Sequence, residues 1–377
     1  LGGYSKDTWI LSNEETSSTT VKKEQDYIQK NPSVYRSDVL PSRTAENFFW
    51  VGRYAERVLG NARFHRTVMQ FVDEANRAFL DNDPLLINSL MYALISYTHS
   101  YPDMEEKERE DKLKDPWKVL AEILLEENRM GSLSYNITSF SRAVLAVRDH
   151  WSTDTWRVLR EMEDEWKIAA ELKGSGHYKL LSKVDKLITS MMAFVSLNRE
   201  SISREQGWIL LDAGRKTEQS LLLISMLQST LVFKQDEQIE YIMQEAVLKS
   251  NESLVNYRYK YRSHIQLNLV LDLMLLDPNN PRSLVYQLER LKAYLEMLPK
   301  KMNGHLLSVQ ERLALEAFTI LKLADSNKLA QHDIETGTYK NLDDFLNKMN
   351  ELLLGISNAV SKMYFKHAQH QQQLFRN

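Results

Sequence analysis

Hydrophobic side chains recur along most of this chain at the spacing of an α-helix. In the stretch 44–80, for example, Phe48, Val51 and Ala55 fall on one helical face. Comparable patterns predict helices at about 84–101, 117–127, 132–149, 153–172, 179–200, 205–232, 236–262, 264–276, 281–297, 307–325 and 340–368. No segment alternates convincingly with a period of two, and a short strand is expected only within residues 1–11. We therefore predict an all-α, multi-helix bundle of roughly a dozen helices.

Two sequence matches indicate an internal duplication of this bundle. The segment Gly52–Glu56, which reads Gly-Arg-Tyr-Ala-Glu, returns at Gly214–Glu218 as Gly-Arg-Lys-Thr-Glu. A Ser-Leu-x-Tyr segment that begins at Ser132 likewise returns at Ser283, each time after Leu-Leu, an acidic residue and Asn. We expect two related helical halves arranged about a pseudo-two-fold axis.

Composition supports the helical prediction and excludes several classes of function. Gly and Pro number only 12 and 8 among 377 residues, so helix breakers are scarce. The net charge of −3 does not favour nucleic acid as a partner. Cys is absent, which excludes disulfides and thiolate chemistry, and with scattered histidines we predict no metal site. The longest apolar patch, Leu85 to Tyr97, is too short to span a bilayer, so we expect a cytoplasmic protein without membrane association.

The beginning of the chain differs from the remainder. Residues 1–11 read as a turn followed by a strand, and residues 12–38 are rich in Ser, Thr, Glu and Lys with little apolar periodicity. We interpret 12–38 as a polar linker and 39–377 as the helical domain. The repeat halves of that domain are placed at about 43–172 and 205–325.

The Gly-Arg-x-x-Glu motif has a structural and a functional interpretation. In the structural one, glycine lets a second helix approach closely, and Arg and Glu pair on one side of the helix. In the functional one, the charged side binds an anion, because guanidinium groups hold a carboxylate or phosphate bidentately. Glu46, Trp50, Arg53 and Arg57 share the side of the first helix opposite its apolar stripe. This arrangement would allow the helix to line a pocket as well as the core.

Arg53 and Arg57 would repel each other if left alone, because they project to the same side of the helix. Unpaired burial would cost several kcal/mol. We therefore expect them to meet protein carboxylates, such as Glu46, Glu56 or Glu218, or an anionic ligand.

The remaining candidates are assigned to the same ligand-binding site or ion-pair network. Arg148-Asp149 is included because two tryptophans follow it and form a polar and aromatic cluster. The full candidate set is Arg43, Glu46, Asn47, Trp50, Arg53, Glu56, Arg57, Arg63, Arg148, Asp149, Arg215 and Glu218. No phosphate-binding, hydrolase or metalloprotease motif is present, so the catalytic residues stay unknown.

The opening of the helical region resembles a known family. Residues 42–63 read S-R-T-A-E-N-F-F-W-V-G-R-Y-A-E-R-V-L-G-N-A-R, and they closely resemble the start of the bacterial alpha-E family. Similar segments follow at 142–149 and 207–218, and the resemblance covers about residues 40–366. The second Gly-Arg motif departs from the family pattern, because Gln219-Ser220 stands where the family has Arg-Ala.

Residues 1–11 resemble the end of a circularly permuted ATP-grasp module, which carries a G-G-x-S-K-D-T-W segment. The resemblance implies that this chain is the C-terminal part of a larger ATP-grasp/alpha-E protein, with that module as its partner in cis or in trans. It also implies ATP-dependent ligation of a carboxylate to an amine. ATP and Mg²⁺ would belong to the upstream module, and this chain would hold no cofactor.

Three hypotheses for the helical domain follow. It is an accessory domain of an amide ligase that binds a partner or a substrate, such as a peptide or a small anionic ligand. Alternatively, it is an independent enzyme with acid/base chemistry from Glu46 or Glu56. The third hypothesis is a purely structural oligomerisation scaffold.

Overall fold

The computed structural model of the chain describes residues 40–77, 84–101, 112–170, 177–262, 264–299 and 306–365. From Pro41 onwards the chain forms one compact unit. The described residues are mostly helical and contain no strand, only isolated β-bridges, so the predicted all-α fold class is confirmed. The strand expected within 1–11 and the linker at 12–38 lie outside the described residues.

The described residues form 14 α-helices, a 3-10 turn (η1, Arg148–His150) and a π-helical turn (η2, Asp272–Leu276). The α-helices are α2 (Ser42–Arg77), α3 (Pro84–Thr98), α5 (Pro116–Leu125), α6 (Leu133–Leu145), α7 (Thr153–Ala170), α8 (His177–Ser201), α9 (Gln206–Leu231), α10 (Glu237–Ser250), α11 (Leu254–Tyr261), α12 (Leu267–Leu271), α13 (Leu284–Met297), α14 (Val309–Lys322), α15 (Ser326–Leu329) and α16 (Lys340–Tyr364). No helix among the described residues is long and apolar enough to cross a membrane.

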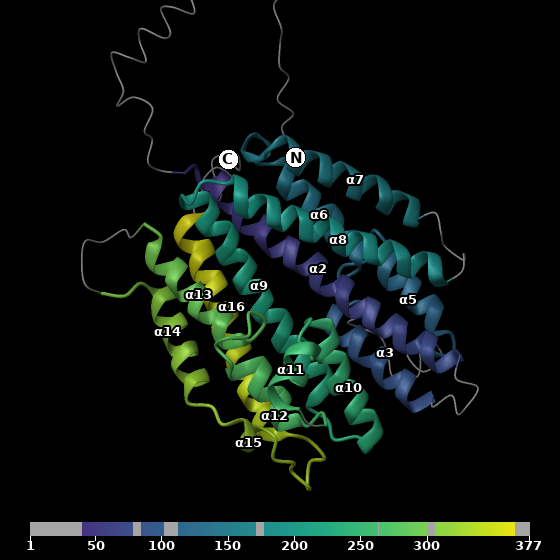
Figure 1. Cartoon of the computed structure of the whole chain (residues 1–377). Helices are drawn as coiled ribbons and strands as arrows, with labels where there is room; N and C mark the ends of the chain where they lie inside the picture. Colours follow the sequence, from purple (N-terminus) through teal and green to yellow (C-terminus); the bar gives the residue numbers. More distant parts are fainter. Residues whose placement is uncertain are drawn as a thin grey trace, which may run out of the picture. The chain divides into compact units, whose positions relative to one another are not determined.

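Helices α2 and α9 lie side by side at the centre of the unit (Figure 1). They run in the same direction, because the Phe48 ring meets Gly207 near the start of both, and Leu222 meets Gly60 farther along. Each of these helices carries one copy of the Gly-Arg-x-x-Glu motif.

The two helices approach most closely at the motif glycines. A Cβ atom on Gly52 would lie 1.9 Å from the carbonyl oxygen of Leu211, and one on Gly214 would lie 2.2 Å from that of Phe49. Backbone atoms cannot yield at such distances without moving a helix. Glycine is therefore required at both positions, as the structural interpretation of the motif predicts.

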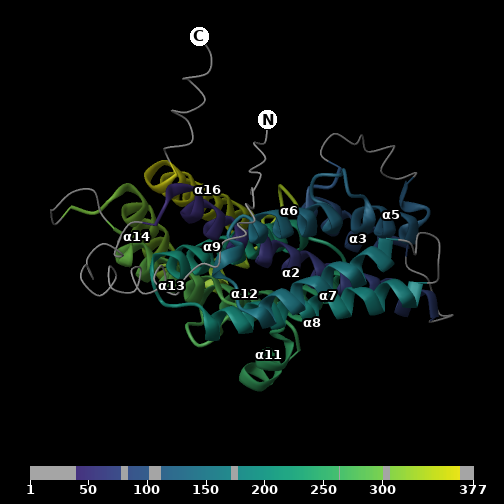
Figure 2. The same ribbon diagram turned by 90° about the horizontal axis from the view of Figure 1, so that it is seen from above.

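The other helices surround this central pair. α6 and α8 pack against α2, whereas α13 and α16 pack against α9. In addition, α3, which follows α2 in the chain, lies against α9. In the same way, α10, which follows α9, lies against α2. Figure 2 shows α7 and α8 together on one side of the unit and α13 and α14 together at one end. The arrangement is compatible with a pseudo-two-fold relation, and the duplication itself stays a prediction.

The repeated Ser-Leu-x-Tyr segments have the same local structure. Ser132 caps the start of α6 and Ser283 caps the start of α13. Each hydroxyl accepts a hydrogen bond from the backbone amide of the Tyr three residues later. Each also donates to the carbonyl oxygen six residues earlier, at 2.6 Å in both cases.

Some helix boundaries differ from those expected. The helix expected at 236–262 is divided into α10 and α11, because Glu252 has a left-handed backbone (φ 53°) and the amide of Ser253 turns back to the carbonyl of Leu248. α6 ends at Leu145 instead of continuing to 149. Neither break contains Gly or Pro, which were the signals used to place helix ends.

Candidate functional site

The Arg and Glu side chains of the two motifs bind each other across the α2–α9 contact. Glu218 of α9 accepts one hydrogen bond from Nε of Arg53 and another from Nε of Arg57, both at 2.6 Å. The Arg53 Nη1 atom also donates to the hydroxyl of Ser357 on α16, at 3.0 Å. One buried carboxylate therefore holds both of the arginines that the sequence places on one side of α2.

The second motif makes the reciprocal contact. Arg215 donates to Oε1 of Glu56 through Nε at 2.8 Å and through Nη2 at 2.5 Å. Its Nη1 atom donates to Asp212 at 3.0 Å. The arginine of each motif thus binds the glutamate of the other motif, and both glutamates are buried.

The electrostatics keep these carboxylates ionised. Burial alone would raise the pKa of Glu56, but Arg215, Arg282 and side-chain hydrogen bonds together lower it to about 2. Burial likewise opposes the charge on Glu218, and the guanidinium groups of Arg57 and Arg53 outweigh it and hold that pKa below its ordinary value. A carboxylate that stays ionised inside an ion pair is a poor proton donor or acceptor near neutral pH.

Aromatic rings cover the outer side of the α2 arginines. The guanidinium carbon of Arg53 lies 5.1 Å from the ring centre of Trp50, and that of Arg57 lies 5.3 Å from Tyr54. Trp50 and Tyr54 also contact each other, with ring centres 5.5 Å apart. The tryptophan that the sequence places beside the charges therefore shields an ion pair.

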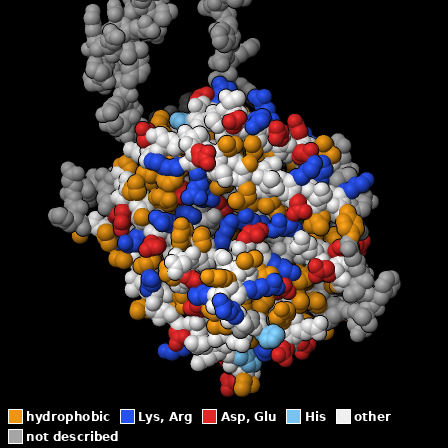
Figure 3. Space-filling model, viewed as in Figure 1, with side chains coloured by type: hydrophobic (Ala, Val, Ile, Leu, Met, Phe, Trp, Pro, Cys, Tyr) orange, Lys and Arg blue, Asp and Glu red, His pale blue; other side chains and the backbone are white. Residues whose placement is uncertain are grey.

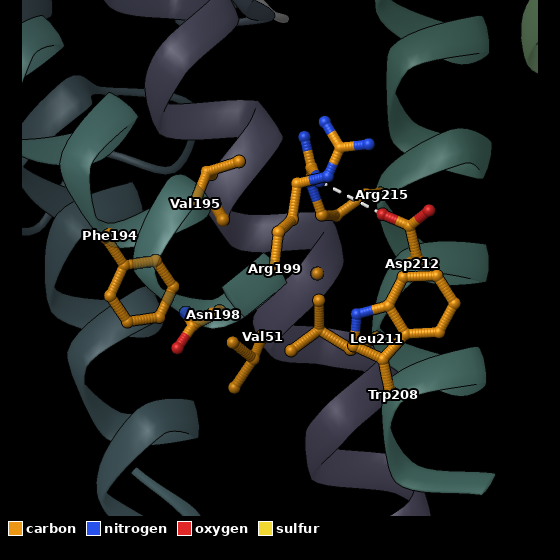
Figure 4. Close-up of a pocket in the computed structure, with 11 residues that line it drawn as sticks. Val51, Phe194, Val195, Asn198, Arg199, Trp208, Leu211, Asp212 and Arg215 are labelled. Atoms are coloured by element: carbon orange, nitrogen blue, oxygen red, sulfur yellow. Dashed lines mark hydrogen bonds and ion pairs between the residues drawn. The ribbon is translucent and has the colours of Figure 1, made fainter. Parts of the chain in front are cut away.

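The space beside the Arg215–Asp212 contact is small. Val51, Gly52, Trp208 and Arg199 are among the residues around it, and its volume is about 10 Å³ (Figure 4). That volume is roughly what one water molecule needs. The motif helices therefore do not enclose a deep substrate pocket at their closest approach.

A larger and more polar cavity lies farther along the two helices. Its volume is about 40 Å³, and it is bordered by α2, α3, α9, α10 and the start of α13. Arg63 from α2 and Arg282 from the segment before α13 both line it, together with the motif glutamate Glu56.

The structure does not bring the other predicted site residues into this cluster. Arg43 is exposed, and its carbonyl oxygen accepts a hydrogen bond from the Asn47 side chain at 2.8 Å, while Glu46 is half-buried on the first turns of α2. Arg148 and Asp149 are exposed, pair with each other at 3.6 Å and border a shallow surface groove between α6 and α7.

Several residues of the network were not found from the sequence. Asp212, Ser357, Arg282, Ser250 and Gln287 all contact or border the charged cluster, but none of them belongs to a recognisable motif. Asp212 could have been found, because it precedes Arg215 by three residues on one helix. Within the described residues, no group of three or more His, Asp or Glu side chains could hold a metal ion.

The helices that carry this cluster match a known family. Residues 40–365 match the Alpha-E family, which is described as a predicted alpha-helical domain with a conserved ER motif. The match covers most of the chain. This chain belongs to the Alpha-E family.

Relatives of this Alpha-E chain occur in mycobacteria. It is 30% identical over 329 residues to an uncharacterised protein of Mycobacterium tuberculosis and to one of Mycobacterium bovis. The alignment covers 84% of this chain but 35% of each relative, so the chain spans about a third of the length of the curated relatives it matches. No solved structure matches it.

Proposed function

We propose that this chain is the accessory helical domain of an ATP-grasp-type amide ligase, and that it binds an anionic group of the substrate or of a partner. The observation that carries this proposal is that two sets of arginines have different surroundings. Arg53, Arg57 and Arg215 are bound by buried carboxylates, whereas Arg63 and Arg282 border a polar cavity. We infer that the first set holds the fold together and that the second set, in which the Arg63 Nε atom has no hydrogen-bond partner, binds the ligand.

The ligase association is supported by the sequence around the helical domain. Residues 1–11 resemble the end of an ATP-grasp module, and the mycobacterial relatives are about three times as long as the aligned region. In the proposed reaction the γ-phosphoryl group of ATP is transferred to a substrate carboxylate. An amine then attacks the acyl phosphate, the amide bond forms and phosphate leaves. ATP and Mg²⁺ would be bound by the ATP-grasp module, and the helical domain would position the substrate and exclude water.

We assign the ER motif of the family to the adjacent pair Glu56-Arg57. Both side chains cross to α9, where Glu56 binds Arg215 and Arg57 binds Glu218. In this assignment the motif fixes α2 against α9 and carries no chemistry.

An independent enzyme is the weaker alternative. It would use Glu56 as an acid or a base, but this carboxylate is buried in an ion pair and its pKa is lowered to about 2. A purely structural scaffold is the stronger alternative, because the ion pairs between α2 and α9 can be explained by their contribution to the fold alone. The cavity beside them is the reason for proposing a binding role.

The proposal is tested in cells that make the full-length protein. Products would be compared by mass spectrometry among cells with the intact protein, cells lacking it, and cells in which the helical domain alone is deleted. We expect an amide-linked product that is lost in both deletion strains. A product that persists without the helical domain would refute the accessory role, and a product without a new amide bond would refute the ligase assignment.

A further inference from the structure

The cavity beside Arg63 contains polar atoms that the protein does not satisfy. The Arg63 side chain is 6% exposed, and its Nε atom has no hydrogen-bond partner. The nearest carboxylate oxygen, on Glu252, is 3.8 Å away and is bound more closely by Arg66 at 2.7 Å. The hydroxyl of Ser250 is also buried without a partner. A buried donor without an acceptor is costly, so these groups favour an acceptor in the cavity.

Arg282 adds a second positive charge to the border of the cavity. Its guanidinium group makes no ion pair of 4.0 Å or less with any described residue, and it faces the cavity from the segment that leads into α13. Glu56 also borders the cavity, but Oε1 of Glu56 is already bound by Arg215. Two arginines, Arg63 and Arg282, therefore border the cavity together with one carboxylate that Arg215 already binds.

Burial and nearby cations both lower the pKa values of basic groups around the cavity. Burial and the nearby Arg282 are the main causes that lower the pKa of Arg63 to about 10. Burial, Arg215 and Arg282 lower the pKa of Lys216 to about 8. In the view of Figure 3, Lys and Arg side chains lie across the middle of the surface, with Asp and Glu side chains among them. An anion in the cavity would relieve the mutual repulsion of Arg63 and Arg282.

Gln287 narrows the choice of anion. Its Nε2 atom donates a hydrogen bond to the carbonyl oxygen of Pro281. This bond fixes the orientation of the side-chain amide, so the other amide atom is the oxygen Oε1. This Oε1 atom is buried without a partner and can only accept a hydrogen bond. Hydrogen phosphate has a hydroxyl to donate, whereas a carboxylate has none. The cavity volume of about 40 Å³ exceeds the roughly 10–15 Å³ that one water molecule needs.

We propose that this cavity between α2, α9, α10 and α13 is a binding site for a phosphate group. Arg63 Nε, the Arg282 guanidinium and the Ser250 hydroxyl donate to the phosphate oxygens, and the phosphate hydroxyl donates to Gln287 Oε1. This inference rests on the ligand-binding part of the proposed function and names its ligand class. It does not require the ATP-grasp association.

The direct test is a calorimetric titration of the 377-residue chain with inorganic phosphate at constant ionic strength. We expect saturable binding with one phosphate per chain. The variant Arg282→Gln should bind phosphate at least about tenfold more weakly, because a charge-assisted hydrogen bond is lost. Arg290→Gln is the matched control: Arg290 is exposed on α13, stacks on Tyr286 and does not border the cavity. The phosphate affinity of Arg290→Gln should differ from that of the parent chain by less than about twofold.

Stability separates a binding role from a folding role. Arg282 repels Arg63 and Lys216 but attracts Glu56, and these contributions oppose each other. Without phosphate, Arg282→Gln should therefore unfold at nearly the same temperature as the parent chain. Added phosphate should raise the unfolding temperature of the parent and the Arg290→Gln chain but not that of Arg282→Gln. Absence of saturable binding by the parent chain, or equal binding by Arg282→Gln, would overturn the proposal.

The source of the phosphate group is distinguished with further probes. Methyl phosphate and inorganic phosphate are compared at a pH below about 6, where methyl phosphate still keeps one hydroxyl to donate to Gln287. Equal binding would indicate a phosphoryl group on a larger molecule, whereas much weaker binding of methyl phosphate would indicate free phosphate. Acetate should not compete, and acetate binding as tightly as phosphate would refute the role given to Gln287. A chain that fails to bind phosphate while the full-length protein still makes its amide product would contradict this site and leave the accessory role intact.

Discussion

Arg215 on α9 and Glu56 on α2 form a buried ion pair in which two guanidinium nitrogens donate to one carboxylate oxygen, at 2.8 and 2.5 Å. The reciprocal contact joins Arg53 to Glu218 at 2.6 Å. Two helices that carry the same short motif are thus held together by exchanging its charges. The glycine that precedes each arginine lets the helices come close enough for this exchange.

The first prediction concerns the coupling between Arg215 and Glu56. Replacing either residue by Ala should destabilise the chain by about 3–5 kcal/mol, because the other charge stays buried without its partner. The double replacement should cost clearly less than the sum of the two single costs. Urea unfolding of the four chains measures this coupling. The exposed pair Arg157 and Asp154, 3.5 Å apart, is the control and should give at most about 1 kcal/mol. Additive costs for Arg215 and Glu56 would mean that the two charges do not interact.

The second prediction concerns glycine at the helix contact. Gly52→Ala should destabilise by about 3 kcal/mol or more, because the added Cβ would overlap the backbone oxygen of Leu211. Gly355→Ala on α16 is the matched control, since its Cβ would meet only the end of the Leu313 side chain, at 3.2 Å. There the higher helix propensity of Ala should leave stability unchanged or raise it by up to about 1 kcal/mol. Thermal unfolding that shows equal effects at both glycines would contradict the close approach.

The third prediction concerns acid sensitivity through His65. This side chain is fully buried in α2, its Nδ1 atom lies 2.7 Å from the carbonyl oxygen of Asn61, and its Nε2 atom has no partner. Burial lowers its pKa from 6.5 to about 4, and the hydrogen bond opposes this only in part. The unfolded chain therefore binds a proton at a higher pH than the folded chain does, and stability should fall as the pH drops from 6.5 towards 4.

A non-titrating variant tests this pH dependence. In His65→Gln, the free energy of unfolding should depend less on pH between 6.5 and 4.5, whereas His332→Gln, at an exposed position, should keep the slope of the parent chain. Below pH 4.5, protonation of Glu56 lowers the stability of both variants further, because the pKa of Glu56 is about 2 in the folded chain and 4.5 in the unfolded chain. An unchanged slope in His65→Gln would mean that another group titrates in this window.

The fourth prediction concerns the two capping serines. Because Ser132 and Ser283 are both fully buried and make the same two hydrogen bonds, Ser132→Ala and Ser283→Ala should each cost about 1–2 kcal/mol. Equal costs within about 0.5 kcal/mol are expected if the positions are equivalent in a duplicated fold. Chemical unfolding that gives clearly different stability costs for the two variants would argue against that equivalence. A superposition of the two halves in which Gly52 does not fall on Gly214 would argue against it as well.

The sequence predicted local features well because they depend on neighbouring residues. The apolar spacing predicted helices close to the observed positions of α2, α6 and α13, since this spacing acts within a few residues. The capping role of Ser132 and Ser283 was found only in the structure. Glu218 was among the carboxylates expected to meet Arg53, because the repeated motif suggested that two similar helices meet.

Long-range features could not be predicted in the same way. The charged side of α2 was expected to line a pocket, yet Arg53 is buried, because α9 and α16 cover that side. Which helix covers which side depends on the packing of the whole unit. The cavity residues Arg282 and Gln287 come near Arg63 only in the folded chain, and no periodic signal connects positions so far apart.

The most direct test of this account is the stability of Arg53→Ala with and without phosphate. If Glu218 is the partner of Arg53, urea unfolding should show a loss of at least about 2 kcal/mol in both conditions, because a buried charge-assisted hydrogen bond is removed. The phosphate affinity of the folded variant should stay within about twofold of that of the parent chain. Normal stability combined with loss of phosphate binding would contradict the account, because it would place the ligand on the motif arginines themselves.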